Sequence, residues 1–186
     1  MTMPIYMRIF KQCLLFITLL VAAQPALALT SIHLLNYEDS YGNISLKYSG
    51  DIHLPNPLIV NGNLNLENSR IRRLPLNLTV KGNLNLAYSS IEQLPLALKV
   101  EGYINLAYSK IKELNFGLQV LGDLSVAHTQ LKKLPDNLYV KGNLFLQNSN
   151  ILTLPNKLVV DGNIYIGNMP LKDLPSDIII GGSLYR

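Results

Sequence analysis

Hydrophobic and polar residues alternate along most of this chain in a unit that recurs every 20 residues. Each unit opens with Leu, usually followed by Pro, at residues 54, 74, 94, 114, 134, 154 and 174. With that Leu counted as position 1, positions 5, 7, 11 and 13 are aliphatic in every complete repeat, as at Leu58, Val60, Leu64 and Leu66 in the first. Strict alternation of this kind is typical of a β-strand with one buried face.

Position 9 is glycine in every repeat and falls inside the alternating segment. A two-residue Asn-Gly hairpin is the first interpretation of this segment. It fails because pairing Val60 with Asn63 would turn Leu64 to the opposite face from Leu58. A bent strand, or two short strands that meet at a corner, keeps all four aliphatic positions on one side. Glycine then provides room on the crowded inside of the bend.

A fixed period of this length predicts a solenoid, because one coil cannot bury its apolar side alone and must stack on its neighbours. The aliphatic residues at positions 18 and 1 point inward again, and Pro at position 2 cannot donate to a ladder. No repeat offers ten residues with helical spacing. The sequence therefore predicts a mainly β, single-domain, right-handed solenoid of 20-residue coils with almost no helix. Six full repeats and a truncated seventh fill residues 54–186.

Small hydroxylated residues recur at position 16, beside the inward positions. Stacked at about 4.8 Å, their hydroxyls are expected to bond the backbone of the loop in the next coil. A structural role is favoured over a catalytic one, because no partnered base recurs beside them. These residues are Ser69, Ser89, Ser109, Thr129 and Ser149.

The two ends of the array differ from its middle. Residues 29–53 are predicted to form an N-terminal cap from a degenerate repeat, in which Ile44 and Leu46 keep the register. The last residues, 184–186, stop within a core strand. Three interpretations are open: Arg186 closes the end as a charged stop, the end docks on a partner or a second copy, or the chain is part of a longer array.

The N-terminal residues 1–28 have the pattern of a secretory signal peptide. Arg8 and Lys11 precede a short apolar segment, 13–23, and Ala26-Leu27-Ala28 is a small-x-small cleavage pattern. Cleavage would remove the only cysteine, Cys13, and leave no membrane span. We expect Sec-type export to the periplasm or the outside of the cell. Without Arg8 and Lys11, 14 basic residues face 12 acidic ones, which disfavours a nucleic-acid partner.

The stretch L-x-L-x-x-S-x-I-x-x-L-P resembles the core of leucine-rich repeats, with Ser or Thr where that family usually has Asn. The 20-residue period and the Leu-Pro pair are similar to the short bacterial leucine-rich repeats of secreted effector proteins. The resemblance covers residues 34–186. The segment L-x-V-x-G departs from it and leaves a curved horseshoe and a straighter β-solenoid both open. Effector function does not carry over, because such effectors usually lack a signal of this type, and this chain has no room for the ubiquitin-ligase domain that some of them carry.

The resemblance implies that residues flanking the core-strand leucines, at positions 10, 12 and 15, line a binding face. Position 12 is polar in the early coils and aromatic in the late ones, and position 6 changes in the same direction. This change indicates a contact surface, or reflects the preference of strands for aromatic residues. The aromatic residues at position 15 stack on and hydrogen-bond a sugar or peptide, or they cover the turn. The candidate ligand-binding residues are Phe145, Tyr165, Tyr185, Tyr139, Tyr88, Tyr108, Asn85 and Asn105.

Charged residues gather at positions 17, 19 and 20. The acids Glu92, Glu113 and Asp173 interrupt them, so both a solvated edge and an anion-binding site are compatible with the pattern. The basic members are Arg70, Arg72, Arg73, Lys110, Lys112, Lys132, Lys133 and Lys172.

The chain carries no recurring motif for catalysis. No carboxylate pair, nucleophile motif or phosphate loop is present, and the three histidines share no ligand spacing. We therefore expect no enzyme activity, no cofactor and no metal. The sequence predicts an exported, non-catalytic binding module for a protein or carbohydrate. The alternative is a structural protein that self-associates as a homo-oligomer through its C-terminal coil.

Overall fold

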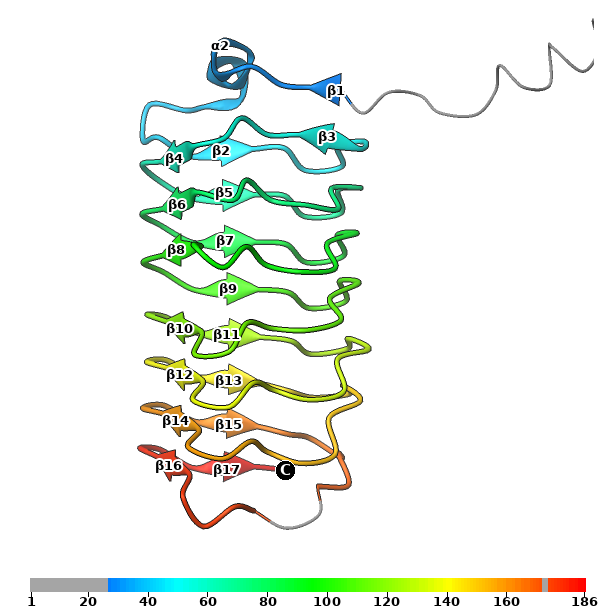
Figure 1. Ribbon diagram of the computed structural model, residues 1–186, viewed down its shortest axis with the longest axis vertical. Coiled ribbons are helices and arrows are strands. Elements are labelled where there is room, and N and C mark those ends of the chain that lie inside the picture. The colour runs from blue at the N-terminus through cyan, green and yellow to red at the C-terminus, as the bar shows by residue number, and fades with distance from the viewer. Residues whose placement is uncertain (1–26, 172–173) are drawn as a thin grey trace, which may run out of the picture.

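The computed structural model describes residues 27–171 and 174–186, which form a β-solenoid of about 7 turns (Figure 1). The prediction of a mainly β fold of stacked parallel strands with almost no helix is confirmed, because only 3% of the chain is helical. The coils stack in a straight column with each turn above the next. The straighter β-solenoid, rather than a curved horseshoe, therefore describes these repeats.

Positions 11 and 12 of successive coils form one eight-stranded parallel sheet that runs the length of the column. Its register advances by one repeat per strand, so that Leu64 pairs with Leu84 and Asn65 with Asn85. Its strands are β2 (Ile44–Ser45), β5 (Leu64–Asn65), β7 (Leu84–Asn85), β9 (Ile104–Asn105), β11 (Leu124–Ser125), β13 (Leu144–Phe145), β15 (Ile164–Tyr165) and β17 (Leu184–Tyr185).

Positions 5 to 7 form a second row of strands on the other side of the corner. This row is divided into a three-stranded and a four-stranded parallel sheet. The first contains β4 (Leu58–Val60), β6 (Leu78–Val80) and β8 (Lys99–Val100), and the second contains β10 (Gln119–Val120), β12 (Tyr139–Val140), β14 (Val159–Val160) and β16 (Ile179–Ile180).

The glycine column at position 9 marks the corner between the two rows, which confirms the bent-strand prediction and excludes the hairpin. Gly62 lies between β4 and β5, which belong to different sheets. Successive glycines approach closely enough for the N–H of Gly82 to donate to the carbonyl of Gly62 at 3.0 Å. A Cβ built on Gly122 would lie 2.7 Å from the carbonyl carbon of Gly102. Close approach of coil to coil therefore requires glycine here.

Asparagines at position 10 form a polar ladder beside the glycine column. The Asn63 Oδ1 atom accepts a hydrogen bond from the backbone N–H of Asn83 at 2.7 Å, one coil away. Asn143 does the same for Asn163 at 2.9 Å. This ladder was not predicted from the sequence. It satisfies backbone donors at the corner, where the sheets are interrupted.

The hydroxyl groups at position 16 do not form the predicted bonds to the backbone of the next coil. Thr129 Oγ1 donates to the carbonyl of Val126 in its own coil at 2.7 Å. The Oγ atoms of Ser69 and Ser89 are buried and have no hydrogen-bond partner among the described residues. The prediction was wrong because backbone takes these bonds: the N–H of Ser90 donates to the carbonyl of Ser69 at 3.1 Å. The hydroxyls are left facing the core.

The N-terminal end of the column carries the two helical elements of the described residues, α2 (Ser31–Leu34) and η1 (Leu35–Tyr37). Ile44 of β2 pairs with Leu64, as the degenerate repeat predicts. A short strand, β1 (Leu27–Ala28), pairs in parallel with β3 (Ile52–His53). Within the described part of the chain, no helix is long and apolar enough to cross a bilayer. Residues 1–26 of the predicted signal peptide lie outside the described residues.

Candidate functional site

The outer face of the eight-stranded sheet carries the aromatic residues predicted at position 12. Position 11 points inward and is fully buried at Leu124 and Leu144, so position 12 points outward. Phe145 stacks on Tyr165 with ring centroids 4.8 Å apart and planes within 5°. Tyr165 stacks in turn on Tyr185 at 4.9 Å and 10°. The structure thus brings three predicted site residues into one column, hereafter the position-12 column.

Ring planes in this column face one another along the rod. The centroid separations equal the spacing of neighbouring strands, about 4.7–4.9 Å, so the rings stack with little offset. Both faces of the Tyr165 ring are covered, one by Phe145 and the other by Tyr185. The column therefore presents ring edges and hydroxyls to the outside. The surface formed by the column is therefore apolar along the ring edges and polar at the tyrosine hydroxyls.

Tyr139 does not join this column, although the sequence places it among the candidates. It lies on β12 in the second row of strands, beyond the glycine corner. Its hydroxyl donates a hydrogen bond to Asp161 Oδ2 at 2.7 Å. That bond to a carboxylate raises the pKa of Tyr139 above its usual value, and burial adds to the effect. Tyr139 thus belongs to a separate surface.

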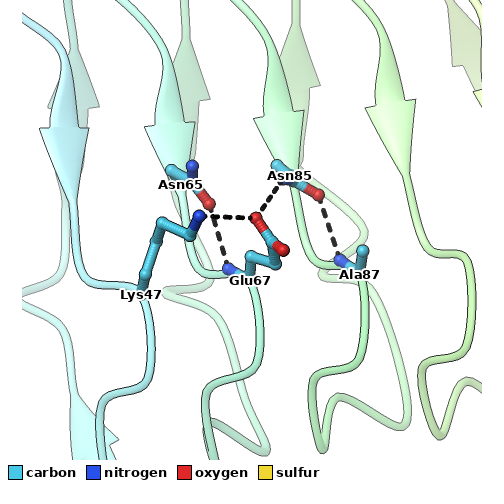
Figure 2. A network of polar contacts seen from close by, with 5 residues as sticks. All are labelled: Lys47, Asn65, Glu67, Asn85 and Ala87. Atoms are coloured by element: carbon cyan, nitrogen blue, oxygen red, sulfur yellow. Dashed lines mark hydrogen bonds and ion pairs between the residues drawn. The ribbon is translucent and has the colours of Figure 1, made fainter.

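The predicted residues Asn85 and Asn105 use their side chains to hold the turn after the strand. The Asn85 Oδ1 atom accepts from the backbone N–H of Ala87 at 3.1 Å, and Asn105 Oδ1 from that of Ala107 at 3.0 Å. In Figure 2 the Asn65 Oδ1 atom accepts the equivalent bond from the backbone N–H of Glu67, and the Asn85 side-chain amide donates to the Glu67 carboxylate. The distance between the Asn85 nitrogen and the Glu67 oxygen is 3.4 Å. These asparagines therefore shape the turn, and their oxygens are occupied.

That polar network ends in a partly exposed ion pair between Lys47 and Glu67, at 3.0 Å (Figure 2). The hydrogen bond to Glu67, and then its charge, raise the pKa of Lys47. The network links three consecutive coils at the N-terminal end of the sheet face. It makes that end of the face polar and charged, in contrast with the aromatic C-terminal end.

A second aromatic column runs along the turn at position 15. Tyr88 stacks on Tyr108 with centroids 4.5 Å apart and planes within 5°. Tyr108 stacks on His128 at 4.2 Å and 8°, and His128 Nε2 lies 3.2 Å from the Asn148 amide nitrogen. Tyr88 and Tyr108 are 53% and 44% exposed, so they do not cover the turn from within. We refer to Tyr88, Tyr108 and His128 as the position-15 column.

The backbone at position 15 is left-handed, which makes these aromatic residues unexpected. The φ angle is +55° at Asn68, +57° at Tyr88, +59° at Tyr108 and +58° at His128. This conformation costs roughly 1–2 kcal/mol for an ordinary L-residue, whereas asparagine adopts it routinely. Asparagine therefore suits the fold at this position, whereas tyrosine adopts it at a backbone cost. The position-15 column thus combines exposed, mutually stacked rings with a strained backbone.

A hollow separates the polar and aromatic parts of the sheet face. Ser125 stands at position 12 between Asn105 and Phe145, and its short side chain leaves the depression. Tyr103 and Asp123, both at position 10, border it. Asp123 Oδ1 accepts from the backbone N–H of Asn143 at 2.7 Å, which holds the carboxylate at the rim. Tyr103, Asp123, Ser125 and His128 were not among the residues predicted from the sequence, although a coil-by-coil comparison of positions 10, 12 and 15 would have found them.

Within residues 27–171 and 174–186, no group of three or more His, Cys, Asp or Glu side chains is placed to hold a metal ion. Comparisons of this chain with protein-family models, with curated proteins and with solved structures found no match.

Proposed function

We propose that this chain is an exported, non-catalytic binding module that recognises a protein ligand through the outer face of its eight-stranded sheet. The observation that carries this proposal is the position-12 column on that face, with the Ser125 hollow beside Phe145. The position-15 column runs along the turn that follows the strands. Aromatic residues are enriched at the energetic centres of protein interfaces, where they fill pockets of the partner. The polar network of Lys47 and Glu67 extends the face beyond the aromatic region.

A protein is favoured over a carbohydrate because of the orientation of the rings. An aromatic side chain grips a sugar chiefly with its flat face, but in both columns these faces are stacked on one another. The free faces are those at the ends of each column. Ring edges, hydroxyls and the small hollow match the mixed apolar and polar side chains of a protein surface. Carbohydrate recognition is the second candidate, supported by Tyr88 at the end of its column.

The chain's own repeats supply the variants that test this proposal. Serine occupies position 12 in the coil of Ser125, so the double variant F145S/Y165S replaces aromatic residues by one that this position accepts. A control on another side of the coil is L96N, because Asn56 and Asn156 occupy the same repeat position. Y139T, which introduces the residue found at the equivalent Thr79, tests whether the second row of strands contributes.

The experiment compares proteins captured from a cell-envelope and medium extract on immobilised wild type, F145S/Y165S, L96N and Y139T, followed by calorimetry with the purified partner. Loss of the position-12 column should weaken binding at least tenfold, since removing a central aromatic contact costs about 2 kcal/mol or more. L96N and Y139T should bind as wild type does. A partner that binds F145S/Y165S as tightly as wild type would show that this face is not the binding surface. If the wild type binds soluble polysaccharides and F145S/Y165S does not, the ligand is a carbohydrate rather than a protein.

We propose further that the coils are short relatives of bacterial leucine-rich repeats. Inward Leu or Ile side chains at positions 11, 13, 18 and 1 support this, as does a buried small polar residue at position 16. Export is likewise a proposal, and it rests on the pattern of residues 1–28. The mass of the mature protein tests it, because cleavage after Ala28 leaves a chain that begins at Leu29.

The alternative function, self-association through the C-terminal coil, predicts a mass that rises with concentration. Light scattering after chromatography measures that mass. A strictly monomeric protein over the tested range would remove the alternative, while an open-ended series of species would favour it over the binding module.

A further inference from the structure

Three exposed apolar side chains line up at position 3 of consecutive coils, far from the sheet face described above. Leu76 is 69% exposed, Leu96 is 90% exposed and Phe116 is 74% exposed. Other coils have a polar residue at this position, as Asn56, Asp136 and Asn156 show. The fold therefore does not require an apolar side chain at position 3. Three apolar residues in a row need another explanation.

Each of these side chains stands at the tip of a tight turn. The N–H of Leu98 donates to the carbonyl of Pro95 at 3.1 Å, so Leu96 lies at the apex of the turn. Phe116 has the same place in the turn closed by Leu118 and Asn115, at 3.2 Å. Turn apices point away from the body of the coil. The three side chains thus project from the same turn of consecutive coils, hereafter the apolar edge. Leu76 and Leu96 line one hollow, and Phe116 lines the next, beyond the interruption of the second row between β8 and β10.

Cationic side chains flank the apolar edge. Arg72 and Arg73 line one hollow together with Leu76 and Leu96. Lys133 lines the next hollow together with Phe116, and the carboxylates of Glu113 and Asp136 line it as well. Positions 19 and 20 of the four coils that fill residues 54–133 carry five cations and two carboxylates: Arg72, Arg73, Lys112, Lys132, Lys133, Glu92 and Glu113.

One of the two carboxylates at positions 19 and 20 is paired with a cation, and the other is hydrogen-bonded to a neutral amide and keeps its charge. Glu92 pairs with Lys112 at 2.6 Å, and Glu113 accepts a hydrogen bond from Gln93. The pairing with Lys112 lowers the pKa of Glu92, so this carboxylate stays ionised and matched. Among the described residues, the ion pairs are Lys47–Glu67 and Lys112–Glu92. Arg72, Arg73 and Lys133 therefore present their charge to the surroundings.

We infer that the apolar edge and its flanking cations rest on the surface of an anionic lipid bilayer. Leu and Phe side chains beside Lys and Arg are the combination that binds the interface of such membranes, with apolar tips among the acyl chains and cations at the headgroups. A line of projecting tips on a straight rod can enter a flat bilayer together. A protein partner would instead need separate pockets for each tip, spaced by about 4.8 Å.

This surface stands independently of the proposed function. Position 3 precedes the second row of strands, whereas the candidate binding face lies on the eight-stranded sheet beyond the glycine corner. A bilayer at the apolar edge would leave that face open to a ligand. The two surfaces can therefore be tested with each other's variants as controls.

The experiment is flotation of the full mature chain with vesicles of phosphatidylcholine alone and of equal parts phosphatidylglycerol and phosphatidylcholine. The wild type should float with the anionic vesicles, at least tenfold more tightly than with neutral ones, and added salt should weaken the binding. L76N/L96N/F116N should lose binding at least tenfold, and R72Q/R73Q should lose both affinity and salt dependence. F145S/Y165S should float as wild type does.

A fluorescence measurement keeps the inference testable if the triple variant folds poorly. The chain has no tryptophan, so F116W introduces a single reporter at the apolar edge, and Y165W places one on the sheet face as a control. Emission from F116W should shift to the blue with anionic vesicles, and that from Y165W should not. Absence of wild-type flotation, equal binding to neutral vesicles, or a shift at Y165W alone would overturn the inference.

Discussion

Tyr108 stacks on His128 with ring centroids 4.2 Å apart, although both residues hold a left-handed backbone with φ near +59°. The same turn position is Asn68 or Asn148 in other coils, and asparagine accepts this backbone without strain. A backbone cost and an exposed aromatic surface thus coincide at one position.

Replacing Tyr108 by Asn should change the free energy of unfolding by no more than about 1 kcal/mol. The loss of stacking, about 0.5–1.5 kcal/mol, is offset by relief of the left-handed strain, which is of similar size. Tyr108→Val should be clearly worse, because a β-branched residue fits this backbone poorly. Urea unfolding of both variants measures the difference. Equal stabilities of the Asn and Val variants would show that the backbone strain is not significant.

Replacing Gly142 by Ala should destabilise the solenoid by about 1–3 kcal/mol or more, since there is no space for a methyl group in the packed corner. A Cβ at this residue would lie 2.8 Å from the carbonyl carbon of Gly122 and 2.8 Å from the nitrogen of Asp123. Gly50→Ala is the matched control, because nothing lies within 4 Å of its added Cβ. Thermal unfolding followed by circular dichroism measures both. A Gly142 variant as stable as the Gly50 variant would contradict the close-approach explanation.

The buried hydroxyls at position 16 should differ in their effect on stability. Ser89→Ala should be neutral or stabilising, because the Ser89 hydroxyl is buried with no partner among the described residues and its removal leaves no acceptor unpaired. Thr129→Val should cost about 1 kcal/mol, because it removes a hydrogen bond to the carbonyl of Val126. Chemical denaturation gives both values. Destabilisation of the Ser89 variant by the same amount would indicate a partner for that hydroxyl.

The Asp39 carboxylate should make the N-terminal end of the solenoid sensitive to acid. The side-chain and backbone hydrogen bonds from Asn43, at 2.9 and 3.0 Å, and that from the N–H of Tyr41 lower the pKa of Asp39 below its usual value. A carboxyl with a depressed folded-state pKa stabilises the fold above its unfolded pKa and loses that contribution as pH falls through the folded value. Asp39→Asn should therefore lower the melting temperature at pH 7, and the difference should shrink below pH of about 4. If the difference in melting temperature between wild type and Asp39→Asn stayed constant down to a pH of about 2, the effect would come from the geometry of the side chain and not from its charge.

Replacing Leu106 by Ala should cost about 2–5 kcal/mol, because this side chain is fully buried between coils. Asn105→Ala should cost about 1 kcal/mol through loss of the bond to the N–H of Ala107. Asn105→Asp keeps the acceptor and is the control. If the Ala and Asp variants of Asn105 had the same stability, the bond to Ala107 would not support the turn.

The sequence predicted the coil and its corner because burial and close approach leave repeated marks. Leu64, Leu66 and Ile71 recur inward in each coil, and Gly62 opens a column that no other residue fits. The free energies of burying these side chains and of packing the corner are large, and they act in the same way in every coil. A period-two pattern that keeps its aliphatic positions on one side through a single glycine allows few arrangements, so the parallel sheets followed from the spacing.

Hydrogen-bond choices were not predictable in the same way. The sequence predicts a bond from Ser69 to the next coil, but backbone carbonyls take that role, and Asn63 instead supplies an inter-coil acceptor. The free energies of alternative hydrogen bonds to one group differ by only about 1 kcal/mol, so the residue type alone does not decide which bond forms. The same holds for Tyr108 and Leu96, whose placement depends on turn conformation. The recurring Asn at position 15 was the available sign of a left-handed turn.

The measurement that tests the central claim most directly is covalent oxidation of tyrosine and phenylalanine side chains in the presence and absence of the captured protein partner, read by mass spectrometry. Tyr108, Tyr165 and Tyr185 should become protected when the partner binds. Two residues elsewhere should stay reactive. They are Tyr41 at the N-terminal end of the column, whose side chain is exposed at 83%, and Phe116 on the apolar edge. Protection of Tyr41 or Phe116 without protection of Tyr165 and Tyr185 would contradict the assignment of the binding face to the eight-stranded sheet.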